Sequence, residues 1–139
     1  MRMPRSCLLL TICALVAGEP VVAECVIIPQ TRSERLAATA LVFVGDVLKV
    51  QTVILDPEPF VYRVTFRVLE AYKGTVRGEQ TFDFGTTTED VRFEAGQRVL
   101  VYASRDLRGK FSSQCTPTRR VVLDDPELAE LRRLSGSSQ

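Results

Sequence analysis

The chain has 139 residues and a formal net charge of +1, and it contains neither histidine nor tryptophan. That length suits one domain with one hydrophobic core. Without histidine the chain cannot build a His-containing catalytic triad or a His-ligated zinc or haem site. The near-neutral charge argues against nucleic acid or an anionic membrane as a partner attracted by the protein as a whole.

The first 23 residues have the features of a secretory signal peptide. Two arginines give a positive start, residues 7–16 form an apolar run too short to span a bilayer, and residues 21–23 offer a cleavage site. We therefore expect a secreted or periplasmic protein whose mature chain begins at Glu24. Cleavage after Gly18 is an alternative, and a buried N-terminal helix is disfavoured because the apolar run has no polar face.

Two of the four cysteines leave with the predicted signal peptide, so the mature chain keeps Cys25 and Cys115. In an exported protein, one cysteine near each end favours a single disulfide bond. A bond that closes so long a loop would stabilise the fold by about 4–5 kcal/mol on the loop-entropy view. Two unpaired thiols are the alternative.

A short helix is expected near the start of the mature chain. Apolar residues 26–28 run up to Pro29, whose missing backbone donor argues against regular structure there. Thr31 then forms a capping box with Glu34, which predicts a helix over residues 32–39.

Two strand signals follow this helix. Residues 41–50 are apolar on both faces with Gly45 in the middle, a pattern typical of a long strand that bends where no side chain obstructs it. Residues 52–55 predict a second, separate strand, and a stiff Asp-Pro-Glu-Pro turn comes after it.

The clearest strand signal covers residues 60–74, where the side chains alternate with the period of a half-buried strand. Its apolar face carries Tyr62, Val64, Phe66 and Val68. Its polar face carries Arg63, Thr65 and Arg67. Such a strand needs neighbours on both edges, so we expect it inside an antiparallel sheet.

The second half of the chain predicts three more strands, at residues 80–84, 98–104 and 110–113, with a loop at 85–96 from which Phe93 plugs the core. Five or six strands in an all-antiparallel pattern, with two short helices, indicate a mainly β fold. A small closed barrel is favoured over a sandwich because the first strand bends.

A second helix is expected at the C-terminal end. Asp125 caps it, Pro126 lies in its first turn and Gly136 follows it. Its apolar side carries Leu128, Leu131 and Leu134. Residues 135–139 are expected to form a disordered tail, which leaves residues 24–134 as the folded domain.

The chain resembles a known family over residues 25–134. The residues that carry the resemblance are 40–47 (ALVFVGDV), 64–68 (VTFRV), 72–74 (YKG), Phe93, Gly96, 100–103 (LVYA), Cys115, Thr118 and Arg119. In this order and spacing they look like the bacterial exported relatives of the tissue inhibitors of metalloproteinases. The resemblance implies a netrin-like barrel of the oligonucleotide/oligosaccharide-binding (OB) type, with a disulfide bond between the N-terminal segment and the region of Cys115.

The resemblance also implies a mode of action. In the animal inhibitors, the α-amino and carbonyl groups of an N-terminal cysteine chelate the zinc of the target protease. Cys25 is the matching position here, and Val26, Ile27 and Ile28 would extend the contact with a partner protein. In the alternative interpretation, these three apolar side chains are simply core.

The polar face of the central strand gives a second hypothesis. Arg63 and Arg67, with Arg98 or Arg92 beside them, would form a basic stripe near Tyr72 that binds an acidic glycan or peptide. An envelope or matrix module would use such a face. The alternative is a solvated outer face that prevents aggregation of the sheet.

An enzyme is the least favoured interpretation. The carboxylate pairs Glu89–Asp90 and Asp124–Asp125 are neighbours on polar segments, where carboxylates are usually solvated. We expect no cofactor, no metal site, no nucleic-acid partner and no transmembrane segment in the mature chain. The sequence therefore favours a non-enzymatic exported module that binds another exported protein, with a protease as the partner that the resemblance suggests.

Overall fold

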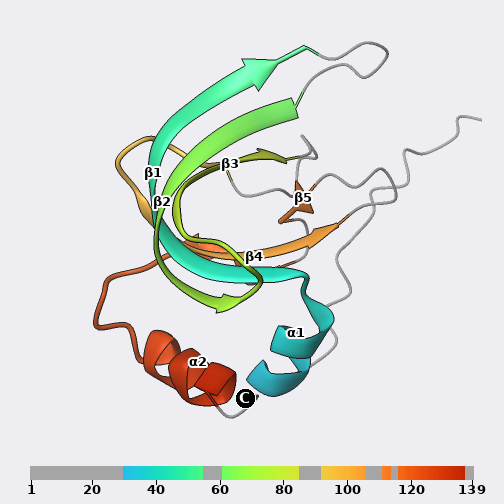
Figure 1. Cartoon of the computed structure of the whole chain (residues 1–139), viewed down its shortest axis with the longest axis vertical. Coiled ribbons are helices and arrows are strands. Elements are labelled where there is room, and N and C mark those ends of the chain that lie inside the picture. The colour runs from blue at the N-terminus through green and yellow to red at the C-terminus, as the bar shows by residue number, and fades with distance from the viewer. Residues whose placement is uncertain (1–29, 55–60, 85–91, 106–110, 114–115, 137–139) are drawn as a thin grey trace, which may run out of the picture.

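The structure is a computed structural model that describes residues 30–54, 61–84, 92–105, 111–113 and 116–136. The expected signal peptide, Cys25, Cys115 and the segment 26–28 lie outside the described residues. The described elements, in chain order, are α1 (Arg32–Ala38), β1 (Leu41–Val53), β2 (Val61–Lys73), β3 (Gly78–Phe84), β4 (Arg98–Arg105), β5 (Phe111–Ser112), β6 (Arg119–Arg120) and α2 (Pro126–Gly136) (Figure 1).

The predicted capping box at the start of α1 is confirmed. The Thr31 hydroxyl accepts a hydrogen bond from the Glu34 backbone N–H at 3.2 Å, and the Glu34 carboxylate accepts one from the Thr31 N–H at 2.7 Å. At the other end, Lys73 Nζ donates to the carbonyl oxygens of Leu36 and Ala37. A cation at a helix C-terminus also suits the helix dipole, so Lys73 holds α1 against β2.

β1 is one continuous bent strand, so the prediction of a separate strand over residues 52–55 is wrong. Residues 41–46 pair with β4, and residues 42–53 pair with β2 through three register shifts. These shifts, typical of β-bulges, let one strand curve between two partners without a break (Figure 1). At the predicted bend, a Cβ on Gly45 would lie 2.9 Å from the carbonyl oxygen of Arg67.

The predicted alternation along β2 is confirmed: Val64 and Phe66 are buried, and Arg67 is exposed. The sheet order is β1-β2-β3-β5-β4-β6, and an additional β1–β4 pairing closes the first five strands into a ring. The expected all-antiparallel pattern is wrong at one place, since Phe84 of β3 pairs in parallel with Phe111 of β5. Strand directions cannot alternate all the way around a ring of five strands, because five is an odd number. At least one pairing in such a ring has to be parallel.

Two hydrophobic clusters lie on the two sides of the curved sheet. The inner cluster fills the ring, where the Phe66 ring stands edge-on to Phe43 and Phe93 at 5.2 and 5.4 Å between centroids. Phe93 is thus in the core, as predicted. The outer cluster joins α2 to the sheet through Val42, Val44, Tyr72, Leu100, Tyr102, Val121, Leu128 and Leu131.

The predicted C-terminal helix is confirmed. The Asp125 carboxylate accepts a hydrogen bond from the Glu127 backbone N–H at 3.0 Å, and Leu128 and Leu131 are fully buried. The helix continues to Gly136 and so includes two residues that were expected in the tail. Neither helix of the described region is long and apolar enough to cross a membrane.

Candidate functional site

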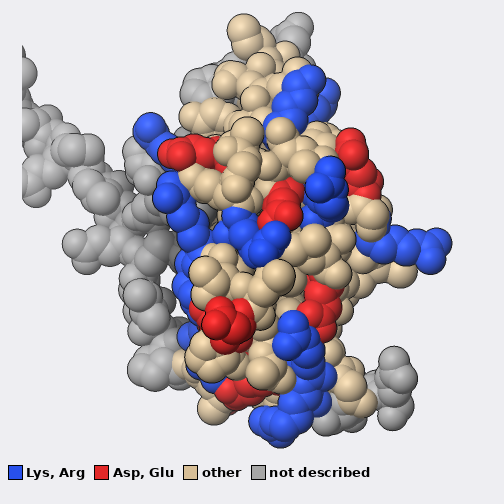
Figure 2. Space-filling view, turned by 90° about the vertical axis from the view of Figure 1, so that its left-hand side faces the viewer, with Lys and Arg blue, Asp and Glu red and all other residues tan. Residues whose placement is uncertain are grey.

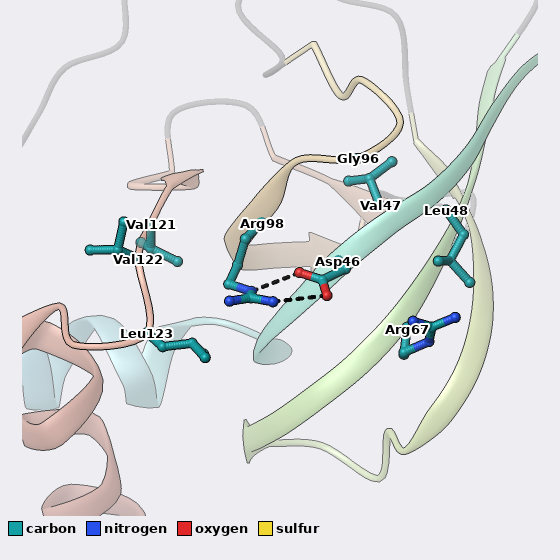
Figure 3. Close-up of a pocket in the computed structure, with 9 residues that line it drawn as sticks. All are labelled: Asp46, Val47, Leu48, Arg67, Gly96, Arg98, Val121, Val122 and Leu123. Carbon is teal, nitrogen blue, oxygen red and sulfur yellow. Dashed lines mark hydrogen bonds and ion pairs between the residues drawn. The ribbon is translucent and has the colours of Figure 1, made fainter.

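A shallow groove lies on the outer surface of the sheet, and we call it the β1–β2 groove (Figure 3). It has a volume of about 560 Å³. β1 and β2 form one side, the start of β4 forms the floor, and the segment between β6 and α2 forms the opposite side. The lining residues are Asp46, Val47, Leu48, Arg67, Gly96, Arg98, Val121, Val122 and Leu123.

An ion pair occupies the floor of the groove. Asp46 on β1 lies in register with Arg67 of β2 on one side and Arg98 of β4 on the other. Arg98 donates from Nε and Nη2 to the two carboxylate oxygens of Asp46 at 2.7 and 3.0 Å. This two-point contact lowers the pKa of Asp46, with a smaller contribution from Arg67, so the carboxylate stays charged.

Arg67 is the cation of the groove that remains available. Its side chain is exposed and makes no hydrogen bond or ion pair with another residue of the described segments. Across the strands it has Asp46 on one side and Glu79 on the other. Because Asp46 is already neutralised by Arg98, the groove carries one excess positive charge at Arg67.

The opposite side of the groove is apolar. Val122 and Leu123 are 64% and 53% exposed, which is unusual for two consecutive branched apolar side chains. Their backbone is fixed, because Val121 donates to the Arg98 carbonyl at 3.1 Å and Asp125 donates to the Val122 carbonyl at 3.2 Å. These two hydrogen bonds, one to β4 and one within the segment, hold the backbone in a position that leaves both side chains exposed.

The structure brings together only part of the predicted anion-binding face. Arg67 lines the groove, but Arg63 donates to both carboxylate oxygens of Asp83 at 2.8 and 2.9 Å, outside the groove. Tyr72 is 6% exposed and packs in the outer cluster with α2. Its hydroxyl donates to Glu70 at 3.2 Å, and burial, together with that carboxylate, raises the pKa of Tyr72 to about 12.

Carboxylates also interrupt the basic stripe expected on the outer face of the sheet. Arg63 faces Asp83, and Arg98 faces Asp46. Figure 2 shows the same mixture over one whole side of the molecule, where Lys and Arg side chains lie next to Asp and Glu side chains. A polyanion would therefore meet both signs of charge along this surface.

Of the groove residues, Asp46, Leu48, Val122 and Leu123 were not predicted as binding residues from the sequence. Asp46 lies in a predicted strand, but its two arginine neighbours come from other strands. The signal for the apolar side was the run Val121–Leu123 just before the cap of α2, where apolar residues have no helical or strand period to explain them. The exposure of such a run becomes visible only in the folded chain.

Where the structure describes the remaining predicted positions, they form no second site. The segment 25–28 and the pair Glu89–Asp90 lie outside the described residues. Asp125 is bound to Arg119 at 2.8 Å, and in the described segments no three Asp, Glu, Cys or His side chains gather as a metal site would need. A smaller cavity of about 150 Å³ is lined by Val50, Tyr62, Arg92, Phe93 and Glu94.

Neither a protein-family model nor a curated protein matches the chain. The interpretation of the β1–β2 groove therefore depends on its own chemistry. Its one carboxylate is held by Arg98, so the groups that it offers to a ligand are the Arg67 guanidinium and the apolar side chains of Leu48, Val122 and Leu123. These groups suit binding, because none of them is a nucleophile or a general base at neutral pH.

Proposed function

We propose that the chain is a non-enzymatic, exported binding module that engages another protein through the β1–β2 groove. The observation that carries this proposal is the exposure of Val122 and Leu123 opposite Arg67 in one depression. Contiguous exposed apolar side chains mark protein interaction sites, whereas single exposed ones, such as Ile54, are common on any surface. Arginine is enriched at protein interfaces, and the buried centre of an interface is more apolar than the rest of the surface.

We further propose that the ring of strands is a small barrel of the OB type. The strand order β1-β2-β3-β5-β4, closed by the β1–β4 pairing, supports this proposal, as does the parallel contact between β3 and β5. An OB barrel binds ligands across the face of its second and third strands and the adjoining loops. The β1–β2 groove shares β2 with that face, through Arg67.

A protein partner has more support than a glycan. A glycan face would need Arg63, Arg67 and Tyr72 together, whereas Arg63 is bound to Asp83 and Tyr72 is covered by α2. Sugar hydroxyls require many polar partners, while the groove offers one available guanidinium and several apolar side chains. The geometry therefore favours a protein over a polysaccharide.

The partner suggested by the resemblance is a protease, bound through the segment that begins at Cys25. That mechanism needs a free α-amino group on Cys25, and a mature chain that begins at Glu24 would lock this nitrogen in a peptide bond. The intact mass of the exported protein, measured with and without reduction and alkylation, separates the two cases. A chain that starts at Cys25 without free thiols would support metalloproteinase inhibition, and a start at Glu24 would exclude zinc chelation.

The groove proposal is tested by photo-cross-linking of the full chain in the cells that export it. A photoreactive amino acid at Leu123 should cross-link to a specific protein, and the additional change Arg67→Glu should remove that adduct. The same amino acid at Ile54, which is 84% exposed and does not line the groove, is the control and should give no such adduct. Equal labelling from both positions, or an adduct insensitive to Arg67→Glu, would contradict the proposal.

A further inference from the structure

We infer that the β1–β2 groove recognises a short peptide segment of its partner in which one carboxylate is flanked by apolar side chains. This inference rests on the proposed function and specifies the chemistry of the partner. It is drawn from the division of the groove into a cationic side and an apolar side.

The charge of the groove selects for a single carboxylate. Arg67 is the one guanidinium of the lining without a partner among the described residues, because Arg98 is engaged by both oxygens of Asp46. A free guanidinium binds a carboxylate through two parallel hydrogen bonds. A strongly acidic segment would place further negative charge near Asp46, and a basic segment would face Arg67 and Arg98. Both are therefore disfavoured relative to one acidic residue.

The position of the apolar side chains selects for apolar neighbours of that carboxylate. In Figure 3, Arg67 and Leu48 lie on the β1–β2 side, Val122 and Leu123 lie on the opposite side, and the Asp46–Arg98 pair lies between them. A ligand that crosses the groove would place its carboxylate at Arg67 and an apolar side chain against Val122 and Leu123. Covering those two side chains removes apolar surface from water and contributes to binding.

A peptide fits this arrangement better than a free inorganic anion. A phosphate dianion is usually held by several converging donors, whereas here one guanidinium is available and a carboxylate lies beside it. The volume of about 560 Å³ is within the usual range of ligand pockets. A peptide also supplies apolar side chains that can cover Val122 and Leu123.

The experiment is a selection of random linear peptides displayed on phage against the mature chain. The wild-type protein should enrich peptides with one Asp or Glu next to Leu, Ile, Val or Phe. Arg67→Glu should change the preferred charged residue to Lys or Arg. Lys49→Glu is the matched control, because Lys49 lies on the same face of β1, is exposed and does not line the groove. This variant should retain the wild-type preference.

A fluorescent copy of one enriched peptide then gives the effect of each side of the groove. Arg67→Gln should weaken its binding by about 10-fold or more, since a charge-assisted contact is lost. Leu123→Ser should weaken binding about 5–30-fold through loss of apolar contact while leaving the thermal unfolding midpoint near the wild-type value.

The inference is overturned if no peptide is enriched, if the enriched peptides lack an acidic residue, or if Arg67→Glu selects the same peptides as the wild type. These failures are distinct from failure of the proposed function. A cross-link from Leu123 to a partner protein, without selection of acidic and apolar peptides, would keep the binding module and reject this class of ligand. Absence of the cross-link would reject the groove as a binding site altogether.

Discussion

Gly45 shows how closely two backbones approach at the bend of β1. A Cβ at this position would lie 2.9 Å from the Arg67 carbonyl oxygen and 3.3 Å from the Phe43 ring. The obstacle is the backbone of β2, which cannot rotate away. We therefore predict that Gly45→Ala lowers the free energy of unfolding by about 1–3 kcal/mol, measured by urea denaturation.

Gly136→Ala is the control for this substitution. Gly136 has open space around its Cβ position, so alanine there should leave the unfolding midpoint unchanged or raise it slightly. If Gly45→Ala were as mild as Gly136→Ala, β1 and β2 would have to separate at the bend at little cost. The close approach would then have no role in shaping β1.

The Asp46–Arg98 pair predicts a dependence of stability on pH. The pair lowers the pKa of Asp46 in the folded protein below its unfolded value of about 3.9. As the pH falls, the unfolded chain therefore takes up this proton first, and the stabilisation is lost progressively as the pH drops through the folded pKa. Above about pH 5 it is fully present.

The corresponding experiment compares the wild type with Asp46→Asn by urea unfolding at neutral pH and in acid. The side chains of Asp46 and Arg98 are 25% and 32% exposed, so the loss at neutral pH should be about 1 kcal/mol. The difference between the two proteins should shrink in acid, where wild-type Asp46 becomes protonated. A difference of the same size at both pH values would show that Asp46 stabilises the fold through its shape and not its charge.

At the level of elements, α2 is attached to the sheet by both apolar and polar contacts. Beneath the helix, the buried Tyr102 hydroxyl donates to Glu127 at 2.7 Å, and Arg119 donates to the other oxygen of Glu127 at 2.9 Å. Arg32 of α1 lies 3.9 Å from the same carboxylate and also pairs with Glu130. Glu127 therefore connects both helices to β4 and to the strand residue Arg119.

Removal of the Tyr102 hydroxyl should loosen this connection. We predict that Tyr102→Phe lowers the free energy of unfolding by about 1–3 kcal/mol, because it leaves a buried carboxylate oxygen without one of its donors. Amide hydrogen exchange in α2 should become faster, since the helix loses its polar anchor.

Tyr72→Phe serves as the matched control for Tyr102→Phe. The Tyr72 hydroxyl also donates to a carboxylate, but the side chain of that partner, Glu70, is 35% exposed and is held by Arg132 as well. Water can replace the lost hydroxyl there, so the cost should be below about 1 kcal/mol. An equal loss in the two variants would mean that the hydrogen bond to the buried Glu127 stabilises the fold no more than the bond to the more exposed Glu70.

The elements themselves could be predicted where their signals are local. The capping box joins residues three positions apart, and the alternation along β2 needs no partner to be recognised. The extent of β1 could not be predicted, because residues 51–53 remain in the strand only through their pairing with residues 61–63 of β2. The sequence pattern instead predicted two strands, over residues 41–50 and 52–55, where the structure has one strand that ends at Val53.

The groove was harder to predict than the elements because its contacts are distant in sequence. Arg98 and Asp46 are 52 positions apart, and Arg63 and Asp83 are 20 positions apart. The sequence predicted the face that carries Arg63 and Arg67, but the register decides which arginine is neutralised. The position of α2, which buries Tyr72, is likewise set by packing of the outer cluster.

For the whole molecule, the narrowest closure of the ring is the β3–β5 pairing. β1 and β2 are in register over eleven residue pairs, whereas β3 and β5 share the single pair Phe84–Phe111 within the described residues. Among the described residues, few backbone hydrogen bonds can hold this closure. The Phe111 ring adds a contact with the Phe82 ring of β3, at 5.2 Å between ring centroids, and lies 4.7 Å from the Arg105 guanidinium of β4. The closure should therefore open before the rest of the ring.

We predict that native-state hydrogen exchange in low urea shows β3 and the end of β4 opening at a lower free energy than β1 and β2. Phe111→Ala removes the ring that contacts both Phe82 and Arg105, so it should lower this local opening free energy by about 1–3 kcal/mol. The exchange of β1 and β2 amides should follow global unfolding in both proteins. If exchange were equally slow in all strands of the wild type, the ring would unfold as a single cooperative unit. The one Phe84–Phe111 pair would then close it as firmly as the long β1–β2 ladder.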